Sequence, residues 1–189
     1  MRKRYFTVLV MACAGLFAAG PVRFELRDTN GVVHTAAEWR AKKAVVLFFT
    51  MTDCPLANGY VPNMNRLRTV YEPQGVAFYA VQVDNTVSDA AVRKYAQEFA
   101  YNFPMLNDPH EVLPRLTGAQ VTPEVAVLSS SGQVLYLGRI DNKVEDLTRP
   151  RYAATEPELR NALDAVLAGK APKEAKTRAV GCAINLESK

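Results

Sequence analysis

The stretch AVVLFFTMTDCPLANGYVP, residues 44–62, decides the fold. It begins with a continuous apolar run, residues 44–49, whose length and composition fit a central strand buried on both faces. The chain then passes through Asp53 and Cys54 to Pro55, and beyond this point apolar residues recur at helical spacing. The sequence therefore predicts a buried strand, a short turn and a helix, with a cysteine at the junction.

The position of Cys54 gives this cysteine a chemical meaning. Unpaired backbone N–H groups and the dipole at a helix N-terminus favour an anion, and a thiolate is both an anion and the reactive form of cysteine. We therefore expect the Cys54 sulfur to lie uncovered at the positive end of the helix and to act as a nucleophile. Asp53 acts in the opposite direction, because a neighbouring carboxylate disfavours a second negative charge. The sequence leaves this balance open.

The other predicted elements alternate between strands and helices. Strands are expected at 22–26, 32–34, 76–83, 103–106, 125–128 and 134–140. Helices are expected after Cys54 up to the stop at Pro73 and Gly75, at 88–99, at 108–116, and from the opening 155–158 to the stop at Gly169. Alternating βαβ units followed by a hairpin and a helix predict the α/β class, with a central mixed β-sheet and helices on both of its faces. The last part of the chain reads as an extended tail.

The N-terminal segment has the pattern of a secretory signal peptide. Positions 2–4 are basic, residues 5–17 are almost wholly apolar, and small residues follow at 18–20. An uncleaved N-terminal anchor is one alternative, and a lipid anchor at Cys13 is another. We expect export to the bacterial periplasm or cell envelope, with no membrane span once the signal is removed.

Export changes how the charge of the chain is interpreted. The 189 residues carry a net charge of +4, and three of the positive charges lie in the signal segment. The remainder is close to neutral, so the charge predicts no nucleic-acid binding. The predicted organisation is a signal peptide over 1–20, one folded domain over 21–169 and a C-terminal tail over 170–189 that carries Cys182.

Three motifs point to one family. Cys-Pro-Leu-Ala at 54–57 stands where thioredoxins have Cys-x-x-Cys, and Pro62 stands where they have the proline that kinks the active-site helix. Val-Thr-Pro at 121–123 is similar to their cis-proline loop. With these motifs, residues 22–168 resemble the thioredoxin-like superfamily, and most closely the redoxin group with the alkyl hydroperoxide reductase/thiol-specific antioxidant (AhpC/TSA) proteins. The resemblance implies a three-layer α/β/α sandwich.

The resemblance also implies a chemistry and its partners. It suggests a thiol-based oxidoreductase or antioxidant protein that acts on a peroxide or a protein disulfide and receives electrons from an unidentified thiol protein. The chain departs from the family at several positions, however. Ala57 replaces the second cysteine, Asp53 the preceding tryptophan and Phe48 the buried acid of thioredoxins. Leu47 and Met51 stand where the peroxiredoxin pattern has proline and threonine.

Cys182 is the remaining candidate for the missing thiol. It lies in a small apolar patch, 180–184, where Gly181 would allow the tail to approach the active site closely. Cys182 would then resolve an intermediate formed on Cys54, or form a static structural bridge with it; intermolecular pairing and no pairing are also open. A 54–182 disulfide would stabilise the fold by roughly 5 kcal/mol from loop entropy, although real bridges often contribute less.

Further residues are predicted to bind the substrate. These are Asp53, Pro55, Asn58, Thr122, Pro123 and Arg139. The backbone of Thr122, beside a cis-Pro123, would pair with an extended substrate peptide. Arg139 would steady a thiolate or a bound peroxide, or else simply pair with a surface acid. For Asp53 and Asn58 the alternative to substrate binding is helix capping.

No cofactor or metal is expected. The chain has two histidines, His34 and His110, and lacks the closely spaced cysteine pair of copper-delivering relatives. A metal site built from Cys54, Cys182 and one histidine is a disfavoured alternative. The rival class of function is a non-catalytic thioredoxin-fold binding module of the cell envelope, which the reactivity of Cys54 would distinguish from an enzyme.

Overall fold

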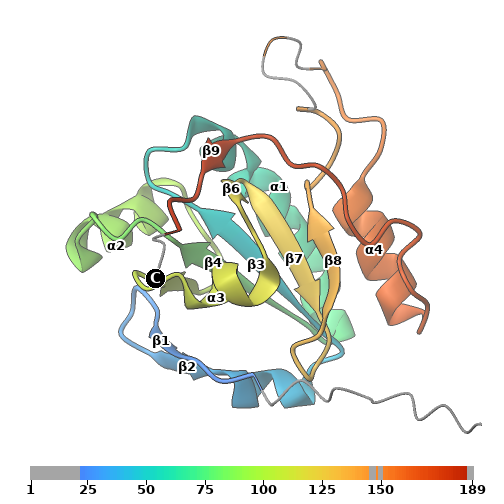
Figure 1. Ribbon diagram of the computed structural model, residues 1–189, viewed down its shortest axis with the longest axis horizontal. Coiled ribbons are helices and arrows are strands. Elements are labelled where there is room, and N and C mark those ends of the chain that lie inside the picture. The colour runs from blue at the N-terminus through green and yellow to red at the C-terminus, as the bar shows by residue number, and fades with distance from the viewer. Residues whose placement is uncertain (1–21, 145–147, 149–150, 187–189) are drawn as a thin grey trace, which may run out of the picture.

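The computed structural model describes residues 22–144, 148 and 151–186, so the predicted signal segment lies outside the described residues. A five-stranded sheet forms the centre, with the order β5-β4-β3-β7-β8 (Figure 1). The strands are β3 (Ala44–Thr50), β4 (Val76–Gln82), β5 (Met105–Asn107), β7 (Glu124–Leu128) and β8 (Val134–Gly138). Strand β3 runs parallel to β4 and antiparallel to β7, which confirms the predicted mixed sheet.

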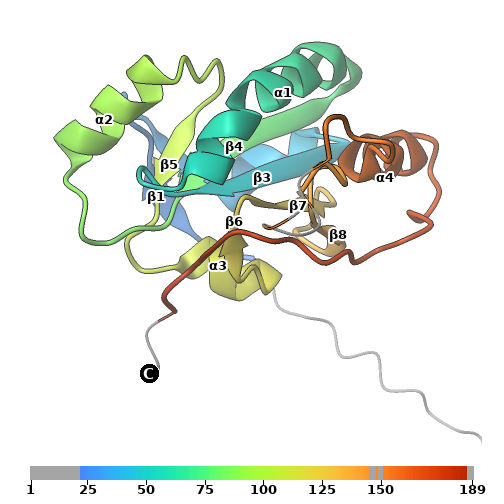
Figure 2. The same cartoon turned by 90° about the horizontal axis from the view of Figure 1, so that it is seen from above.

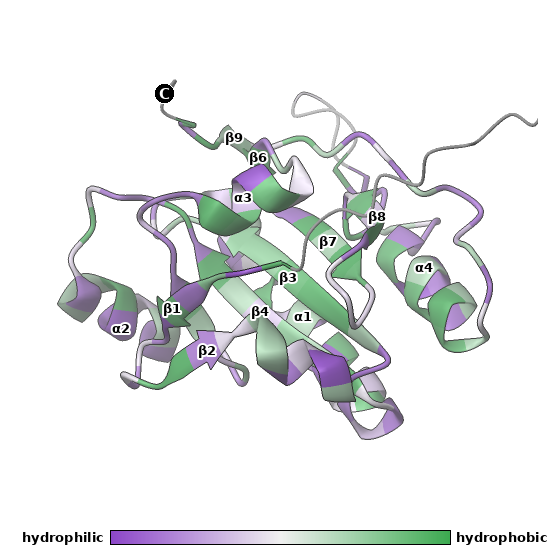
Figure 3. Cartoon of the chain, turned by 60° about the horizontal axis from the view of Figure 1, so that its bottom comes forward, coloured by the Kyte–Doolittle hydropathy of each residue, from purple (hydrophilic) through white to green (hydrophobic). Residues whose placement is uncertain are grey.

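The apolar run of β3 forms the middle of the molecule because its side chains enter two cores. Phe48 packs on one face of the sheet and Phe49 on the other, and both are fully buried. Figure 3 shows the central strands as the most continuously hydrophobic part of the fold. Complete burial of such side chains contributes about 1.5–3 kcal/mol each.

Helices and a hairpin cover the two faces of the sheet. Helices α1 (Pro55–Tyr71), α2 (Asp89–Glu98) and α4 (Glu158–Leu167) pack on the face that carries Phe48. The opposite face carries α3 (Val112–Thr117), a 3₁₀ helix η1 (Ala36–Ala41) and the hairpin of β1 (Glu25–Arg27) and β2 (Val33–Thr35). Figure 2 shows α1 and α4 on one side and α3 on the other. The result is the three-layer sandwich that the resemblance implies.

Local signals explain most helix boundaries. Ser88 caps α2, since its hydroxyl accepts a hydrogen bond from the Ala91 backbone N–H. A short 3₁₀ helix, η2 (Glu72–Gln74), extends α1, and Gly75 ends it in the left-handed conformation at φ 94°. Within the described residues, no helix has the length and apolar character needed to cross a bilayer.

The predicted start of α3 at Asp108 is wrong. The helix begins at Val112, and Glu111 precedes it with a left-handed backbone at φ 55°. The Asp108 carboxylate still accepts hydrogen bonds from the N–H groups of Val112 and Leu113, at 2.9 and 2.7 Å. Asp108 therefore accepts hydrogen bonds from the first N–H groups of α3 although it lies in the turn before the helix. The sequence pattern alone cannot distinguish this role from that of an N-cap.

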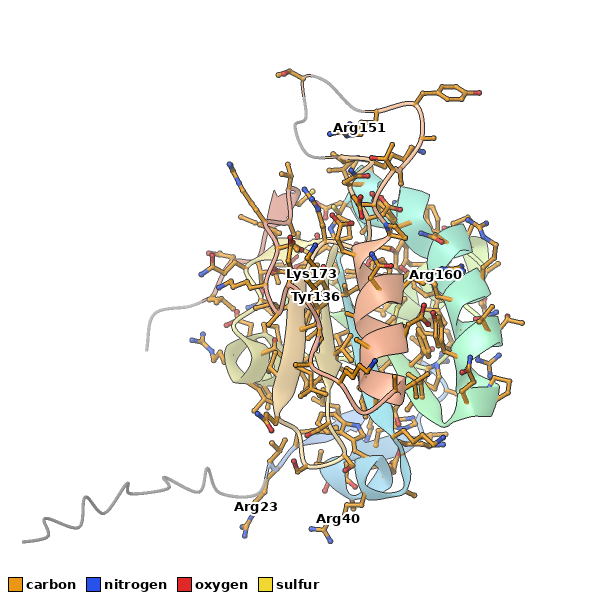
Figure 4. All side chains as sticks on the ribbon, turned by 90° about the vertical axis from the view of Figure 1, so that its right-hand side faces the viewer. Arg23, Arg40, Tyr136, Arg151, Arg160 and Lys173 are labelled. Atoms are coloured by element: carbon orange, nitrogen blue, oxygen red, sulfur yellow. The ribbon has the colours of Figure 1, made fainter. Side chains whose placement is uncertain are left out.

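The tail is more ordered than a simple extended segment. It first follows β8, where Leu137 donates to the Ala175 carbonyl and accepts from Thr177. The Tyr136 hydroxyl, labelled in Figure 4, lies 2.7 Å from the Thr177 hydroxyl. The tail then forms β9 (Cys182–Ala183), which pairs antiparallel with β6 (Val121–Thr122). Figure 1 shows β9 beside β6, near the top of the view.

Candidate active site

Cys54 lies at the junction that the sequence predicts. It is the N-cap of α1, with extended backbone angles of φ −88° and ψ 102°. Its N–H donates to the Met51 carbonyl in a tight turn at 3.2 Å, and its carbonyl accepts the helical N–H of Asn58 at 3.1 Å. Pro55 follows as the first helical residue, where the missing N–H costs no hydrogen bond. Strand β3 and a helix of 17 residues thus fix the position of the sulfur.

The expectation that this sulfur is uncovered is wrong. Cys54 is 0% exposed. Its thiol donates to the Thr122 carbonyl at 3.0 Å, and the Cys182 thiol donates to the Cys54 sulfur at 2.7 Å. The cover is therefore formed in part by a short loop and by a two-residue strand of the tail, and not by the hydrophobic core alone.

The loop beneath the tail carries the predicted cis-proline. The Thr122–Pro123 peptide bond is cis, which confirms that expectation. In the register of the β6–β9 pair, Thr122 lies opposite Cys182. Gly181 lies so close to this loop that a Cβ placed on it would be 2.0 Å from the Thr122 carbonyl oxygen. The predicted close approach at Gly181 is thus a contact between two backbones.

The surroundings of Cys182 keep it protonated. Burial, the hydrogen bond to Cys54 and the nearby charges of Cys54 and Asp53 raise the pKa of Cys182 to about 11. Cys182 therefore remains a thiol at neutral pH and donates its proton towards Cys54. In the reduced protein the two sulfurs and the Thr122 carbonyl form one chain of donors and acceptors, and both cysteines are free.

A cluster of hydroxyl groups lies near Cys54 and was missed by the sequence reasoning. The Tyr95 hydroxyl lies 2.9 Å from the Thr50 hydroxyl and 3.0 Å from that of Tyr101, and it donates to Asn58 at 2.7 Å. Burial raises the pKa of both tyrosines, and the charge of Cys54 raises them further. The sequence predicts a helix over 88–99 that contains Tyr95. It does not predict the cluster, because Tyr101 lies beyond this helix and Thr50 comes from the strand.

The remaining predicted residues lie in different settings. Asp53 and Pro55 are exposed beside Cys54, and Asn58 accepts the Tyr95 hydrogen bond rather than capping the helix. Arg139 forms an ion pair with Glu158 of α4, with a nitrogen–oxygen distance of 2.5 Å. Arg139 thus pairs with an acid, as its alternative expects, but this acid is largely buried and does not lie on the surface.

A cleft opens beside the helix that starts at Cys54. Its volume is about 630 Å³, and Pro55 and Leu56 form the part of its wall next to the cysteine. Tyr60 reaches into the same region and donates to the buried Asp141 at 2.6 Å. Figure 4 labels Arg160 on α4, which also lines this cleft. The cleft provides room next to Cys54 for a partner larger than a peroxide.

The two histidines do not join this site. The nitrogens of His34 lie 2.9 Å from Glu38 and 3.4 Å from Asp28, at the β1–β2 hairpin. His110 is exposed in the turn before α3. Among the described residues, no three His, Cys, Asp or Glu side chains come together in a way that could hold a metal ion.

The chain is similar to a known family and to curated proteins. The family model described as "AhpC/TSA family" matches residues 20–137. The thiol-disulfide oxidoreductase ResA of Geobacillus thermodenitrificans is 31% identical over 111 residues, which are 59% of this chain and 62% of the relative. ResA of Geobacillus kaustophilus is 29% identical over 67% of this chain and 71% of its own length.

Solved structures agree with this assignment. A hypothetical protein of Sinorhizobium meliloti 1021, SMc02350, superposes with a TM-score of 0.74 at 25% identity over 89% of this chain and 93% of that protein. An uncharacterised conserved protein of Geobacillus kaustophilus gives a TM-score of 0.76 at 26% identity, covering 89% and 91% of the two chains. The likeness extends over most of the chain, so it includes the sheet and the helices that position Cys54.

Proposed function

The chain belongs to the AhpC/TSA family, and we propose that within it this protein is a thiol-disulfide oxidoreductase whose redox pair is Cys54 and Cys182. The observation that carries the proposal is the 2.7 Å contact between two sulfurs that lie 128 residues apart in sequence. The contact stands at a helix N-terminus beside the cis-Pro123 loop. The ResA relatives, named as thiol-disulfide oxidoreductases, support the same activity.

The first chemical step uses Cys54. After it has released its proton to water, its thiolate attacks one sulfur of a substrate disulfide and forms a new S–S bond with it. The other substrate sulfur leaves as a thiolate and takes up a proton from water. Cys54 is assigned this step because the N-terminus of α1 favours a negative charge on its sulfur. The Thr122 carbonyl contacts the sulfur, and the Asn58 N–H bonds to the Cys54 carbonyl. We expect Thr122 and Asn58, together with Asp53, Pro55 and Pro123 beside them in the chain, to contact the substrate.

The second step uses Cys182. Its thiol loses a proton, and the thiolate attacks the Cys54 sulfur, so that the mixed disulfide breaks and a Cys54–Cys182 disulfide forms. The remaining substrate sulfur leaves as a thiol. The substrate disulfide has gained the two electrons that the two cysteines have lost. A donor thiol protein then reduces the Cys54–Cys182 bond and restores both thiols.

A disulfide is the preferred substrate over a peroxide. Leu47 and Met51 occupy the positions of the proline and threonine of the peroxidatic pattern, and Arg139 is engaged with Glu158. A protein disulfide also matches the cleft beside Pro55 better than a peroxide does. The basic and apolar pattern of residues 1–20 supports export of this activity to the periplasm or cell envelope.

Turnover of a model disulfide tests the proposal. The reduced protein is mixed with insulin and excess dithiothreitol, and its rate is compared with that of Cys54→Ser and Cys182→Ser, with Thr69→Val on the exposed face of α1 as the control. We expect Cys54→Ser to lose turnover and Thr69→Val to retain the wild-type rate. Reduced Cys182→Ser, mixed with insulin after dithiothreitol has been removed, should accumulate the mixed disulfide of Cys54 with insulin. Hydrogen peroxide should react more slowly than the disulfide. A protein whose thiols react with neither compound would instead be a binding module.

A further inference from the structure

The tail is attached to the body of the protein at two separate places. The first attachment is on β8, where Ala175 and Thr177 exchange backbone hydrogen bonds with Leu137 at 3.0 and 3.1 Å. The second is on β6, where Cys182 and Ala183 pair with Thr122 and Val121. Residues 178–181 connect the two. The second attachment can therefore open while the first remains closed.

The second attachment is small. Strand β9 has two residues. Of the residues 184–186 that the structure describes after it, only Ile184 is buried, with 7% exposure. One further backbone bond joins the Ile184 N–H to the Gln120 carbonyl at 2.8 Å. Segments with few buried apolar contacts open more easily than core strands. Opening of this segment alone is thus the least costly way to expose Cys54.

Such opening is required before a protein disulfide can react. The Cys54 sulfur is fully buried, its proton is bonded to the Thr122 carbonyl, and Cys182 occupies the position from which a substrate sulfur would approach. A substrate sulfur must reach the same atom in line with attack. The tail and the substrate therefore compete for one place.

The backbone edge of β6 defines what can replace the tail. An extended segment can pair with this edge as β9 does, with its own cysteine opposite Thr122. The residue before that cysteine then takes the place of Gly181. There a Cβ would lie 2.0 Å from the carbonyl oxygen and 2.7 Å from the carbonyl carbon of Thr122. Both contacts are with backbone, so a side chain at this place cannot be accommodated by a simple rotation.

We propose that residues 180–184 are a displaceable strand that closes the reduced site, and that substrate proteins enter by replacing it with an extended segment that has glycine immediately before its cysteine. This inference rests on the proposed thiol-disulfide exchange at Cys54. The return of the tail then has a second effect. It brings Cys182 to the mixed disulfide and removes the substrate strand from the same edge, so that resolution and product release occur together.

The rate of Cys54 alkylation tests whether the tail closes the site. The reduced full-length protein is pulsed with iodoacetamide and digested with trypsin, which places Cys54 and Cys182 in separate peptides, 44–66 and 179–189. In Gly181→Ala the added methyl group must displace the strand, and we expect Cys54 to react about tenfold faster or more. Gly59→Ala is the matched control, because a Cβ at Gly59 meets nothing within 4 Å.

A second variant and a second reading keep the test independent of folding. Ile184→Ala weakens the same attachment without touching the Thr122 contact, and it should also accelerate labelling of Cys54. Circular dichroism confirms that each variant is folded. If Cys54 in folded Gly181→Ala and Ile184→Ala reacts at the wild-type rate, the tail does not close the site. Because alkylation requires no turnover, this result is distinct from failure of the proposed activity in the insulin assay.

The glycine requirement is tested with a peptide. The octapeptide AVGCAINL, which copies residues 179–186, is prepared as a mixed disulfide with 5-thio-2-nitrobenzoate, and release of the chromophore reports attack by Cys54. On the opened Gly181→Ala/Cys182→Ser double variant, in which Cys182 can no longer attack the peptide, we expect this peptide to react about tenfold faster than AVACAINL. Equal rates for the two peptides would overturn the requirement for glycine, whereas a faster AVGCAINL supports it.

Discussion

Cys54 and Cys182 contact each other, but very different amounts of structure hold them in place. Cys54 follows a seven-residue buried strand and caps a helix of 17 residues, and both elements belong to the main core. Cys182 belongs to a strand of two residues near the end of the chain. One half of the redox pair is therefore fixed and the other is mounted on a segment that can leave. A pair built in this way can admit a large substrate between its two sulfurs.

The largest expected effect is on the free energy of unfolding, when a side chain of the core is removed. Phe48→Ala removes a fully buried ring from β3 and should lower the free energy of unfolding by about 3–5 kcal/mol. Urea denaturation, followed by the fluorescence of Trp39, measures this. Ile184→Ala in the tail should cost less than about 1 kcal/mol in the same experiment, since the tail can open before global unfolding. Equal costs would remove the contrast between the two regions.

Oxidation of Cys54 and Cys182 to a disulfide should remove the difference in stability between the tail and the core. A Cys54–Cys182 disulfide ties the tail to the core and should raise the free energy of unfolding by about 2–4 kcal/mol. The comparison is between oxidised and reduced wild-type protein in urea. Cys182→Ser provides the control, because its stability should not change under the same oxidising conditions. An unchanged midpoint in the wild type would mean that the two thiols do not pair within one chain.

A smaller effect is expected at the first attachment of the tail. The Thr177 hydroxyl lies 2.7 Å from the Tyr136 hydroxyl and accepts from the Arg139 N–H at 3.1 Å. Thr177→Val removes one hydrogen bond from the Arg139 N–H and one from the Tyr136 hydroxyl, which keeps its bond to the Arg139 carbonyl, and should cost about 1–2 kcal/mol. Thr69→Val on the exposed face of α1 is the matched control and should stay within about 0.5 kcal/mol of the wild type. If the two variants unfold alike, the tail is not anchored through Thr177.

The smallest effect is a dependence on pH. The pKa of Cys182 rises to about 11 in the closed form because of burial and the nearby Cys54 and Asp53, so the closed form holds this proton more tightly than the open form does. The stability of the closed tail is therefore complete below the ordinary cysteine pKa of about 9 and decreases as the pH rises towards 11. Hydrogen exchange at residues 182–184 should accelerate across this range in the wild type more than in Cys182→Ser. Slower exchange at high pH would contradict the sign.

The same contrast explains what could be predicted from the sequence. The apolar run of β3 and the helical stripe of α1 are strong local patterns, and they placed Cys54 at its junction correctly. The cis-Pro123 loop was recognisable from its motif. The start of α3 was misplaced because the Asp108 carboxylate can serve a helix terminus from more than one position.

The exposure of Cys54 could not be predicted, since it depends on a segment without periodicity. Strand β9 is too short to produce an alternating pattern, and its partner lies far away in the sequence. The hydroxyl cluster of Thr50, Tyr95 and Tyr101 could not be predicted for a similar reason, because its residues come from different parts of the sequence. Local patterns therefore predicted the elements, while the contacts between distant short segments required the three-dimensional structure.

The bridge between Leu137 and Lys176 has a consequence for solubility. Strand β8 lies at the margin of the central sheet, and an open margin invites pairing with another molecule. Residues 175–177 form hydrogen bonds with the backbone N–H and carbonyl of Leu137 on that edge. A chain truncated before residue 175 would therefore tend to self-associate, although its core would stay intact. A chain truncated after position 178 keeps residues 175–177 on β8 and should stay monomeric. A chain truncated before position 175 loses these residues and exposes the edge of β8.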